Sequence, residues 1–274
     1  MLGTSAGAAR PVPSIKTGRP ATDLQASPPQ SMPEDEARMP EMALGMASHS
    51  KPEVTSSAEQ AAEGEPTPMK LYVMPGACSL ASHIALVWTG APYELAVLSH
   101  AEVGGEGYRK LNPKGAVPAL ALDDGTVITE SLAVLEYIAD SYPDARLDAA
   151  PGSVLERARL NEALAELVSD VHKAWAPVFA PGRYVMQEAN QDDAKQAAFA
   201  QLDKQYARLD QRMQGQEWLL FGRRTVADAY LYVMCRWKDR SPTPLARYPA
   251  LAAFKARLDA DEEVQRALGE EPTG

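Results

Sequence analysis

A short apolar strand that leads directly into a helix is the feature that most limits how this chain can fold. The run Lys70-Leu-Tyr-Val-Met74 ends at Pro75-Gly76, which predicts a buried strand followed by a turn. Apolar residues then recur at helical spacing from Leu80 to Val87, until Gly90 ends the segment. The chain therefore enters its first domain as a strand, loop, helix unit.

Three further strands and a second long helix are expected after this unit. Residues 93–98 alternate weakly as a strand, and residues 117–122 form another. The turn Asp124-Gly125 leads that strand into a fourth at 126–129. Ser131 can cap the helix that follows, because a serine hydroxyl accepts a bond from a free N–H at a helix start.

Strands disappear after a linker at about 144–151, and the second half is predicted to be a helical bundle. Apolar residues line one face of a helix over 160–171 and of another over 199–213. Thr225-Val-Ala-Asp228 has the form of a capping box at the start of a further helix. The expected domains are an α/β domain at 69–143 and an all-helical domain at 152–268.

Residues 1–68 differ in composition from the rest of the chain. They hold 10 of the 22 prolines and few large apolar residues. Such a segment cannot bury enough surface to offset the entropy of ordering it, so we expect a disordered N-terminal extension. Two interpretations stay open, an artefact of the choice of start codon and a regulatory or tethering tail.

Charge and cysteine content exclude several classes of function. The net charge of −10 repels phosphate backbones and anionic lipids, so neither nucleic acid nor a membrane is an expected partner. No apolar stretch is long enough for a membrane helix, and the N-terminus lacks the apolar core of a signal peptide. Two cysteines cannot form a disulfide framework, and no His and carboxylate spacing predicts a metal site. A cytoplasmic location is expected.

Cys78 is the first candidate for chemistry. It lies between the first strand and a helix that begins near Ser79, where free N–H groups and the helix dipole favour an anion. A thiolate is such an anion, so this position predicts a lowered thiol pKa. The alternative is that a lone small cysteine only fills space.

Val117-Pro118 is the second candidate. A proline that starts the third strand beside the first helix is a candidate for a cis peptide bond. That geometry would turn the backbone N–H and C=O of Val117 outward, where they could pair with an extended peptide.

Glu130-Ser131 is the third candidate, at the junction of the fourth strand and its helix. The helix start supplies N–H donors for a carboxylate, and the glutamate can hold an ammonium group. The pair fits the charged end of an amino acid, although a strand-end acid and a capping serine explain the residues equally well.

His172 is the fourth candidate and lies beside the apolar stripe of the first helix of the second domain, next to Lys173. A histidine at such an edge can serve catalysis, but it can equally be a surface or interface residue.

The run from Met69 to His83, MKLYVMPGACSLASH, closely resembles the opening of the beta-class bacterial glutathione transferases. Asn112-Pro-Lys-Gly-Ala-Val-Pro-Ala-Leu120 is similar to the cis-proline segment of that family, and Thr129-Glu-Ser131 to its γ-glutamyl site. Trp218-Leu-Leu-Phe-Gly followed by Thr225 to Tyr230 resembles its helical capping motif. The resemblance extends from Met69 to about Leu268.

The resemblance implies a thioredoxin-like β-α-β-α-β-β-α domain followed by an all-α domain, with glutathione as co-substrate and no metal. It implies that Cys78 contacts the glutathione sulfur, with Ser79 beside it. Val117 at Pro118 would pair with the cysteinyl backbone, and Glu130 with Ser131 would hold the γ-glutamyl group. It also implies a homodimer in which His172 and Lys173 face the cleft from the second domain.

Three positions depart from the family pattern. Val73 stands where tyrosine is common, Ala165 stands where asparagine is common, and the loop around 103–106 is shorter and lacks a lysine that contacts glutathione. These departures bear on glutathione affinity and on the rate of conjugation.

Three hypotheses follow for function. The first is a glutathione transferase that stabilises glutathione thiolate for attack on a hydrophobic electrophile. The second is a disulfide reductase or peroxidase in which the Cys78 thiolate forms a mixed disulfide with glutathione. The third is a binding or interaction module without turnover.

Overall fold

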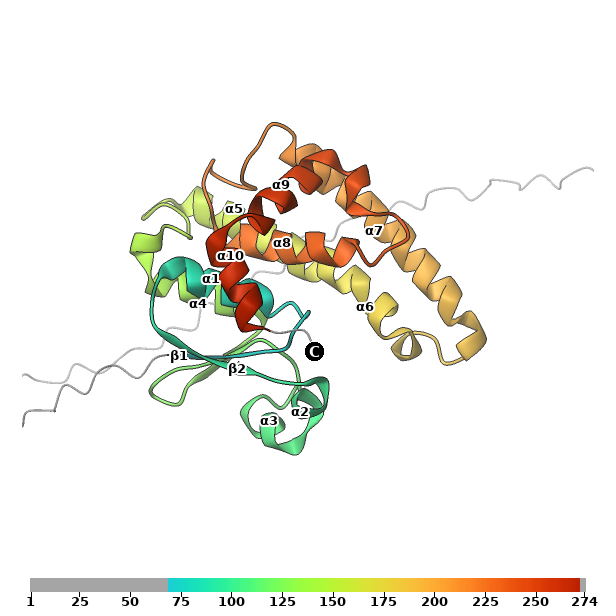
Figure 1. Cartoon of the computed structure of the whole chain (residues 1–274), viewed down its shortest axis with the longest axis horizontal. Helices are drawn as coiled ribbons and strands as arrows, with labels where there is room; N and C mark the ends of the chain where they lie inside the picture. The colour runs from blue at the N-terminus through green and yellow to red at the C-terminus, as the bar shows by residue number, and fades with distance from the viewer. Residues whose placement is uncertain (1–68, 272–274) are drawn as a thin grey trace, which may run out of the picture. The chain divides into compact units, whose positions relative to one another are not determined.

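The structure is a computed structural model that describes residues 69–271 (Figure 1). The extension predicted at 1–68 lies outside the described residues. Within them every β-strand falls between Met69 and Thr129, and helices make up the rest of the chain. The α/β domain followed by a helical domain is therefore confirmed, while the boundaries 69–143 and 152–268 stay predictions.

Four strands form one mixed sheet in the order β2-β1-β3-β4. The strands are β1 (Met69–Val73), β2 (Tyr93–Val97), β3 (Ala119–Ala121) and β4 (Val127–Thr129). β1 is parallel to β2 and antiparallel to β3, which pairs with β4 through the predicted turn. The last three lie within the expected segments, and β1 begins and ends one residue earlier than predicted. β3 begins two residues later than predicted, because Val117 and Pro118 precede the paired residues.

The two faces of the sheet are covered by different helices. The helices of this half are α1 (Leu80–Thr89), α2 (His100–Gly104), α3 (Glu106–Leu111) and α4 (Ser131–Ser141). Side chains alternate along β1, so Leu71 and Val73 join the core with α1 and α4, whereas Tyr72 packs with Val103 and Tyr108 of α2 and α3. The predicted single helix between β2 and β3 is thus two short helices.

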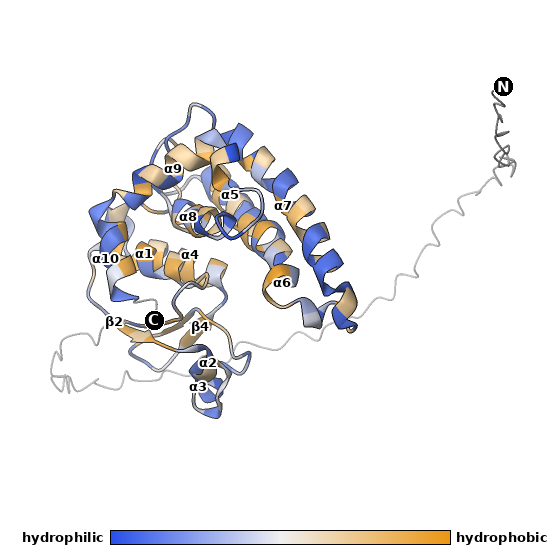
Figure 2. Ribbon diagram, turned by 45° about the vertical axis from the view of Figure 1, so that its right-hand side comes forward, coloured by the Kyte–Doolittle hydropathy of each residue, from blue (hydrophilic) through white to orange (hydrophobic). Residues whose placement is uncertain are grey.

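The helical half surrounds α8. Its elements are η1 (Pro143–Ala145), α5 (Val154–Ala165), η2 (Glu166–His172), α6 (Lys173–Phe179), η3 (Pro181–Arg183), η4 (Glu188–Asn190), α7 (Gln191–Met213), α8 (Val226–Lys238), η5 (Leu245–Arg247), α9 (Pro249–Asp259) and α10 (Glu262–Glu270). Hydrophilic and hydrophobic residues alternate along α7, as expected for a helix with one face on the core (Figure 2). In contrast, α8 is buried along almost its whole length and packs against α1, α5 and α9.

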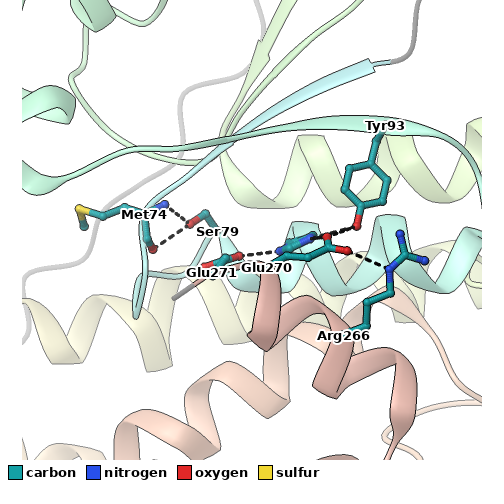
Figure 3. Close-up of polar contacts among 7 residues, drawn as sticks. Met74, Ser79, Tyr93, Arg266, Glu270 and Glu271 are labelled. Carbon is teal, nitrogen blue, oxygen red and sulfur yellow. Dashed lines mark hydrogen bonds and ion pairs between the residues drawn. The ribbon is translucent and has the colours of Figure 1, made fainter. Parts of the chain in front are cut away.

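A buried histidine joins α1 to the end of the chain. His83 is fully buried, and its Nδ1 lies 2.8 Å from a carboxylate oxygen of Glu271. Its Nε2 lies 3.0 Å from Glu270, which also accepts hydrogen bonds from Tyr93 and Arg266 (Figure 3). Burial alone would raise the pKa of Glu270, but these hydrogen bonds lower it to about 2. The contacts hold α10 against α1 and β2.

The predicted capping box at Thr225 is present. The Asp228 carboxylate accepts hydrogen bonds from the Thr225 N–H at 2.8 Å and the Thr225 hydroxyl at 2.9 Å. It also accepts one from the N–H of Leu219 at 2.8 Å. Asp228 is fully buried, so this one side chain satisfies three donors that water does not reach and orients α8 relative to the preceding loop.

We predict that Asp228→Ala lowers the free energy of unfolding by about 3 kcal/mol, because it leaves three buried donors without an acceptor. Urea unfolding followed by far-UV circular dichroism measures the change. Asp123→Ala, at an exposed position, is the control and should change stability by less than about 0.5 kcal/mol. Equal stability of the two variants would show that the capping box contributes little.

Candidate functional site

Cys78 lies in the loop between β1 and α1, two residues before the helix begins. Its thiol donates to the backbone oxygen of Val117 across 3.5 Å, and the hydroxyl of Ser131 donates to its sulfur across 3.7 Å. Three segments that are distant in the sequence therefore meet at one sulfur atom. The sequence prediction named all three residues.

The pKa of Cys78 departs from the prediction. Only 8% of the residue is exposed, and burial raises the pKa of its thiol above the ordinary value. The neighbouring hydroxyl groups of Ser131 and Tyr230 lower the pKa but offset the burial only in part. The predicted lowering of the Cys78 pKa is therefore wrong. Removing a thiolate from water costs more free energy than the N-terminal end of a helix contributes by stabilising the charge.

Ser79 is directed away from this sulfur. Its hydroxyl accepts a hydrogen bond from the N–H of Met74 at 3.1 Å and donates to the Met74 carbonyl at 3.4 Å (Figure 3). The side chain is fully buried. Ser79 thus closes the loop that carries Cys78, which fixes the position of the sulfur.

The Val117-Pro118 peptide bond is cis, as predicted. Tyr108 and Asn112 both donate to the carbonyl of Ala116, at 2.8 and 2.7 Å, and hold the backbone just before it. The carbonyl of Val117 accepts the Cys78 thiol, whereas its N–H makes no backbone hydrogen bond within residues 69–271. One of the two groups expected to face outward is therefore available for an added peptide.

The start of α4 differs from the predicted cap. Ser131 is the first helical residue, and Glu130 occupies the capping position with a φ of 74°, a conformation that is costly for a residue with a side chain. No side chain in the described chain caps this helix, and its first backbone bond is donated by Val134. The preceding N–H groups can therefore bind an anion. The Glu130 carboxylate meets the Lys114 ammonium at the surface.

His172 ends η2, a π-helical segment of the kind often found at functional sites. Its Nδ1 lies 2.5 Å from the hydroxyl of Tyr230 on α8. Burial, followed by the charge of Lys173, lowers the pKa of His172 to about 4, so the ring is neutral near pH 7. Lys173 itself is exposed.

Tyr230 is a site residue that the sequence analysis missed, since it was named there only as the end of the capping motif. It is fully buried, and its hydroxyl interacts with Cys78 and Ser131 as well as with His172. Burial raises its pKa well above the ordinary value and keeps it a phenol. A tyrosine within an apolar stripe needs a polar partner, and that requirement was the available signal.

Aromatic side chains adjoin His172 on its other side. The ring of Trp237 meets that of His172 edge-on, with centroids 4.9 Å apart, and meets Phe179 at the same distance. The indole N–H of Trp237 donates to the carbonyl of Gly76 at 3.0 Å. An apolar surface therefore lies next to the loop that carries Cys78.

Residues 69–271 also bear on metal binding and on membrane insertion. No three His, Cys, Asp or Glu side chains there are grouped so that they could hold a metal ion. None of the helices in this part of the chain is both long enough and apolar enough to span a bilayer.

Two family models match the chain. The N-terminal domain of glutathione S-transferases matches residues 76–141, and the C-terminal domain matches residues 174–262. The glutathione S-transferase GST-4.5 of Xanthomonas campestris is 40% identical over 200 residues, which cover 73% of this chain and 97% of that protein.

Solved structures give the same result. A sphingomonad glutathione S-transferase complexed with glutathione is 40% identical, with a TM-score of 0.67, and the match covers 74% of this chain and 98% of that one. The beta-class enzyme of Sphingomonas chungbukensis is 39% identical, with the same TM-score and the same coverage. The chain therefore belongs to the glutathione S-transferase family, in its bacterial beta class.

Proposed function

We propose that the protein binds glutathione beside Cys78 and stabilises its thiolate for attack on a hydrophobic electrophile. The observation that carries the proposal is the cluster of hydrogen-bonding groups at the Cys78 sulfur, where Ser131 and Tyr230 converge from the two halves of the chain. His172 extends this cluster toward the aromatic surface.

The peptide backbone of glutathione fits two features next to the cluster. The free N–H of Val117 can pair with the cysteinyl residue as in an added strand. The uncapped start of α4 at Ser131 can receive the γ-glutamyl carboxylate, and Glu130 lies where an ammonium group would follow. These two contacts would direct the glutathione sulfur toward Cys78.

Cys78 acts in this proposal as a neutral hydrogen-bond donor. A buried thiol whose pKa is raised stays protonated, and its S–H can turn from the carbonyl of Val117 to a glutathione thiolate. The Tyr230 hydroxyl shares one hydrogen bond with Nδ1 of the neutral His172, and when that hydroxyl is the donor the Nε2–H of the ring is a further donor. Such donors favour the thiolate over the thiol.

The thiolate would then attack an electrophilic carbon held against Trp237 and Phe179. A sulfur–carbon bond forms, the leaving group departs with its electron pair, and the thiol proton has already passed to solvent. The aromatic surface favours apolar electrophiles, because it removes their surface from water.

We predict that Cys78→Ala lowers kcat/KM for glutathione and 1-chloro-2,4-dinitrobenzene about tenfold, the effect of losing one hydrogen bond to a charged atom. Steady-state rates with varied glutathione measure the change. Cys235→Ala removes the other buried cysteine, on α8, and is the matched control. Equal rates for both variants would mean that Cys78 has no part in binding or activating glutathione.

A test of the whole proposal needs two measurements on the unaltered protein. It should be retained on immobilised glutathione, and it should conjugate the chlorinated aromatic faster than the uncatalysed reaction. Retention without turnover would indicate a binding module, and failure of both would overturn the proposal.

Glutathione-dependent disulfide exchange is the second candidate activity. It needs an accessible Cys78 thiolate, whereas this thiol is buried and its pKa is raised. Cys235, the only other cysteine of the chain, is fully buried on α8. We therefore predict no mixed disulfide after incubation with oxidised glutathione, as measured by intact mass. An adduct of one glutathione on Cys78 would instead favour the redox activity.

We predict that His172 makes the protein less stable as the pH falls from about 6.5 to about 4. The folded-state pKa of about 4 lies below the unfolded value, so the unfolded chain binds the proton first and gains about 2 kcal/mol over this range. The contribution of neutral His172 to the free energy of unfolding is fully present above pH 6.5 and is lost as the pH falls toward 4.

Urea unfolding between pH 7 and pH 4.5 measures this effect. In His172→Gln the loss of stability with falling pH should be smaller than in the unaltered protein. His100→Gln, at an exposed histidine of α2, should leave the profile unchanged. Parallel profiles for all three proteins would contradict the assignment of a neutral, half-buried His172. The homodimer and the cytoplasmic location stay predictions.

A further inference from the structure

A cavity adjoins the loop that carries Cys78. Its volume is about 360 Å³, and it is lined by Gly76 and Ala77 of that loop and by residues of α1, α8 and α9. Leu80, Val233 and Trp237 also line it, although each of them is largely buried. A cavity of this size is suited to a small molecule.

The charged residues of this cavity are mainly cationic. Arg236, Arg240 and Lys255 line it together with one acid, Asp239. Lys255 is already paired, since its ammonium lies 2.8 Å from Asp259 and 3.7 Å from Asp239. Within residues 69–271 neither arginine has a carboxylate partner within 4.0 Å.

Arg240 is exposed, and Arg236 is half-buried with its Nη1 3.4 Å from the Tyr232 hydroxyl, so no acid neutralises either guanidinium. Arg236 lies in the last turn of α8, and Arg240 follows two residues after the helix ends at Lys238. The negative end of the helix dipole favours cations there, but it does not pair with them individually. An anion in the cavity would pair with both, because guanidinium groups bind carboxylates through two N–H groups.

The position of Arg240 links this charge to the proposed reaction site. Its Nη2 lies so close to Gly76 that a Cβ at that glycine would be only 3.2 Å away. The carbonyl of Gly76 accepts a hydrogen bond from the indole N–H of Trp237, and the ring of Trp237 also contacts that of His172. The cavity and the aromatic surface thus share Trp237 and the loop before Cys78.

We propose that this cavity binds the carboxylate of an aromatic electrophile, so that the enzyme prefers anionic aromatic electrophiles to uncharged ones. The inference rests on the proposed function and specifies its substrate class. The ring lies against Trp237, the carboxylate meets Arg240 and Arg236, and the reactive carbon faces the glutathione sulfur.

A matched pair of substrates tests the proposal, 4-chloro-3-nitrobenzoate and its methyl ester. With either one, the glutathione sulfur bonds to the ring carbon, the carbon–chlorine bond breaks, chloride leaves with the electron pair and the thiol proton passes to buffer. The ratio of kcat/KM for acid and ester, each divided by its uncatalysed rate, isolates the contribution of the carboxylate.

We expect this ratio to favour the acid about tenfold in the unaltered protein and to fall about tenfold in Arg240→Gln. Arg236→Gln should act in the same direction, which keeps the test open if one variant does not fold. Arg208→Gln, at an exposed arginine of α7, is the control and should keep the ratio of the unaltered protein. An equal ratio in all four proteins would falsify the proposal.

Calorimetric titration with 4-chloro-3-nitrobenzoate in the absence of glutathione separates this inference from the proposed function. Binding that is lost in Arg240→Gln supports the cavity as a carboxylate site even if neither substrate is turned over. If the ester is turned over and the unaltered protein and Arg240→Gln bind the acid equally well, the proposed transferase activity is upheld and the proposed carboxylate site is overturned.

Discussion

Helices α1 and α8 lie against each other with almost every side chain buried, and this contact determines where the functional groups meet. One helix follows the loop that carries Cys78, and the other carries Tyr230 and Trp237. Packing them together removes much apolar surface from water and also brings a phenol and an indole to that loop. The site therefore depends on the contact between the two halves as much as on either half alone.

Burial at this contact also determines the chemistry of the sulfur. A helix dipole favours an anion by about 1 kcal/mol, while removal of a thiolate from water costs several times as much. The desolvation of Cys78 is therefore the larger effect, and hydroxyl groups compensate for it only in part. A thiol of this kind is better suited to stabilise another charge than to carry one.

Charge is distributed unevenly over this acidic protein. The buried ammonium of Lys238 is balanced by Asp203. Arg236 and Arg240, which are half-buried and exposed, have no acidic partner within residues 69–271 and line a cavity beside the same loop as Cys78. The same helix thus contributes hydrogen-bond donors near one end and positive charge at the other.

The amino-acid sequence alone determined the order of strands and helices, the capping box at Asp228 and the identity of Cys78, Val117 and Ser131 as residues that would meet. These features depend on local spacing and on long, specific motifs, so they can be predicted without coordinates. The tertiary structure alone decided the direction of the Cys78 pKa, the role of Tyr230 and the pairing of His83 with the end of the chain. Each of these depends on burial and on contacts between distant segments, because solvation and pairing energies are set by neighbours in space.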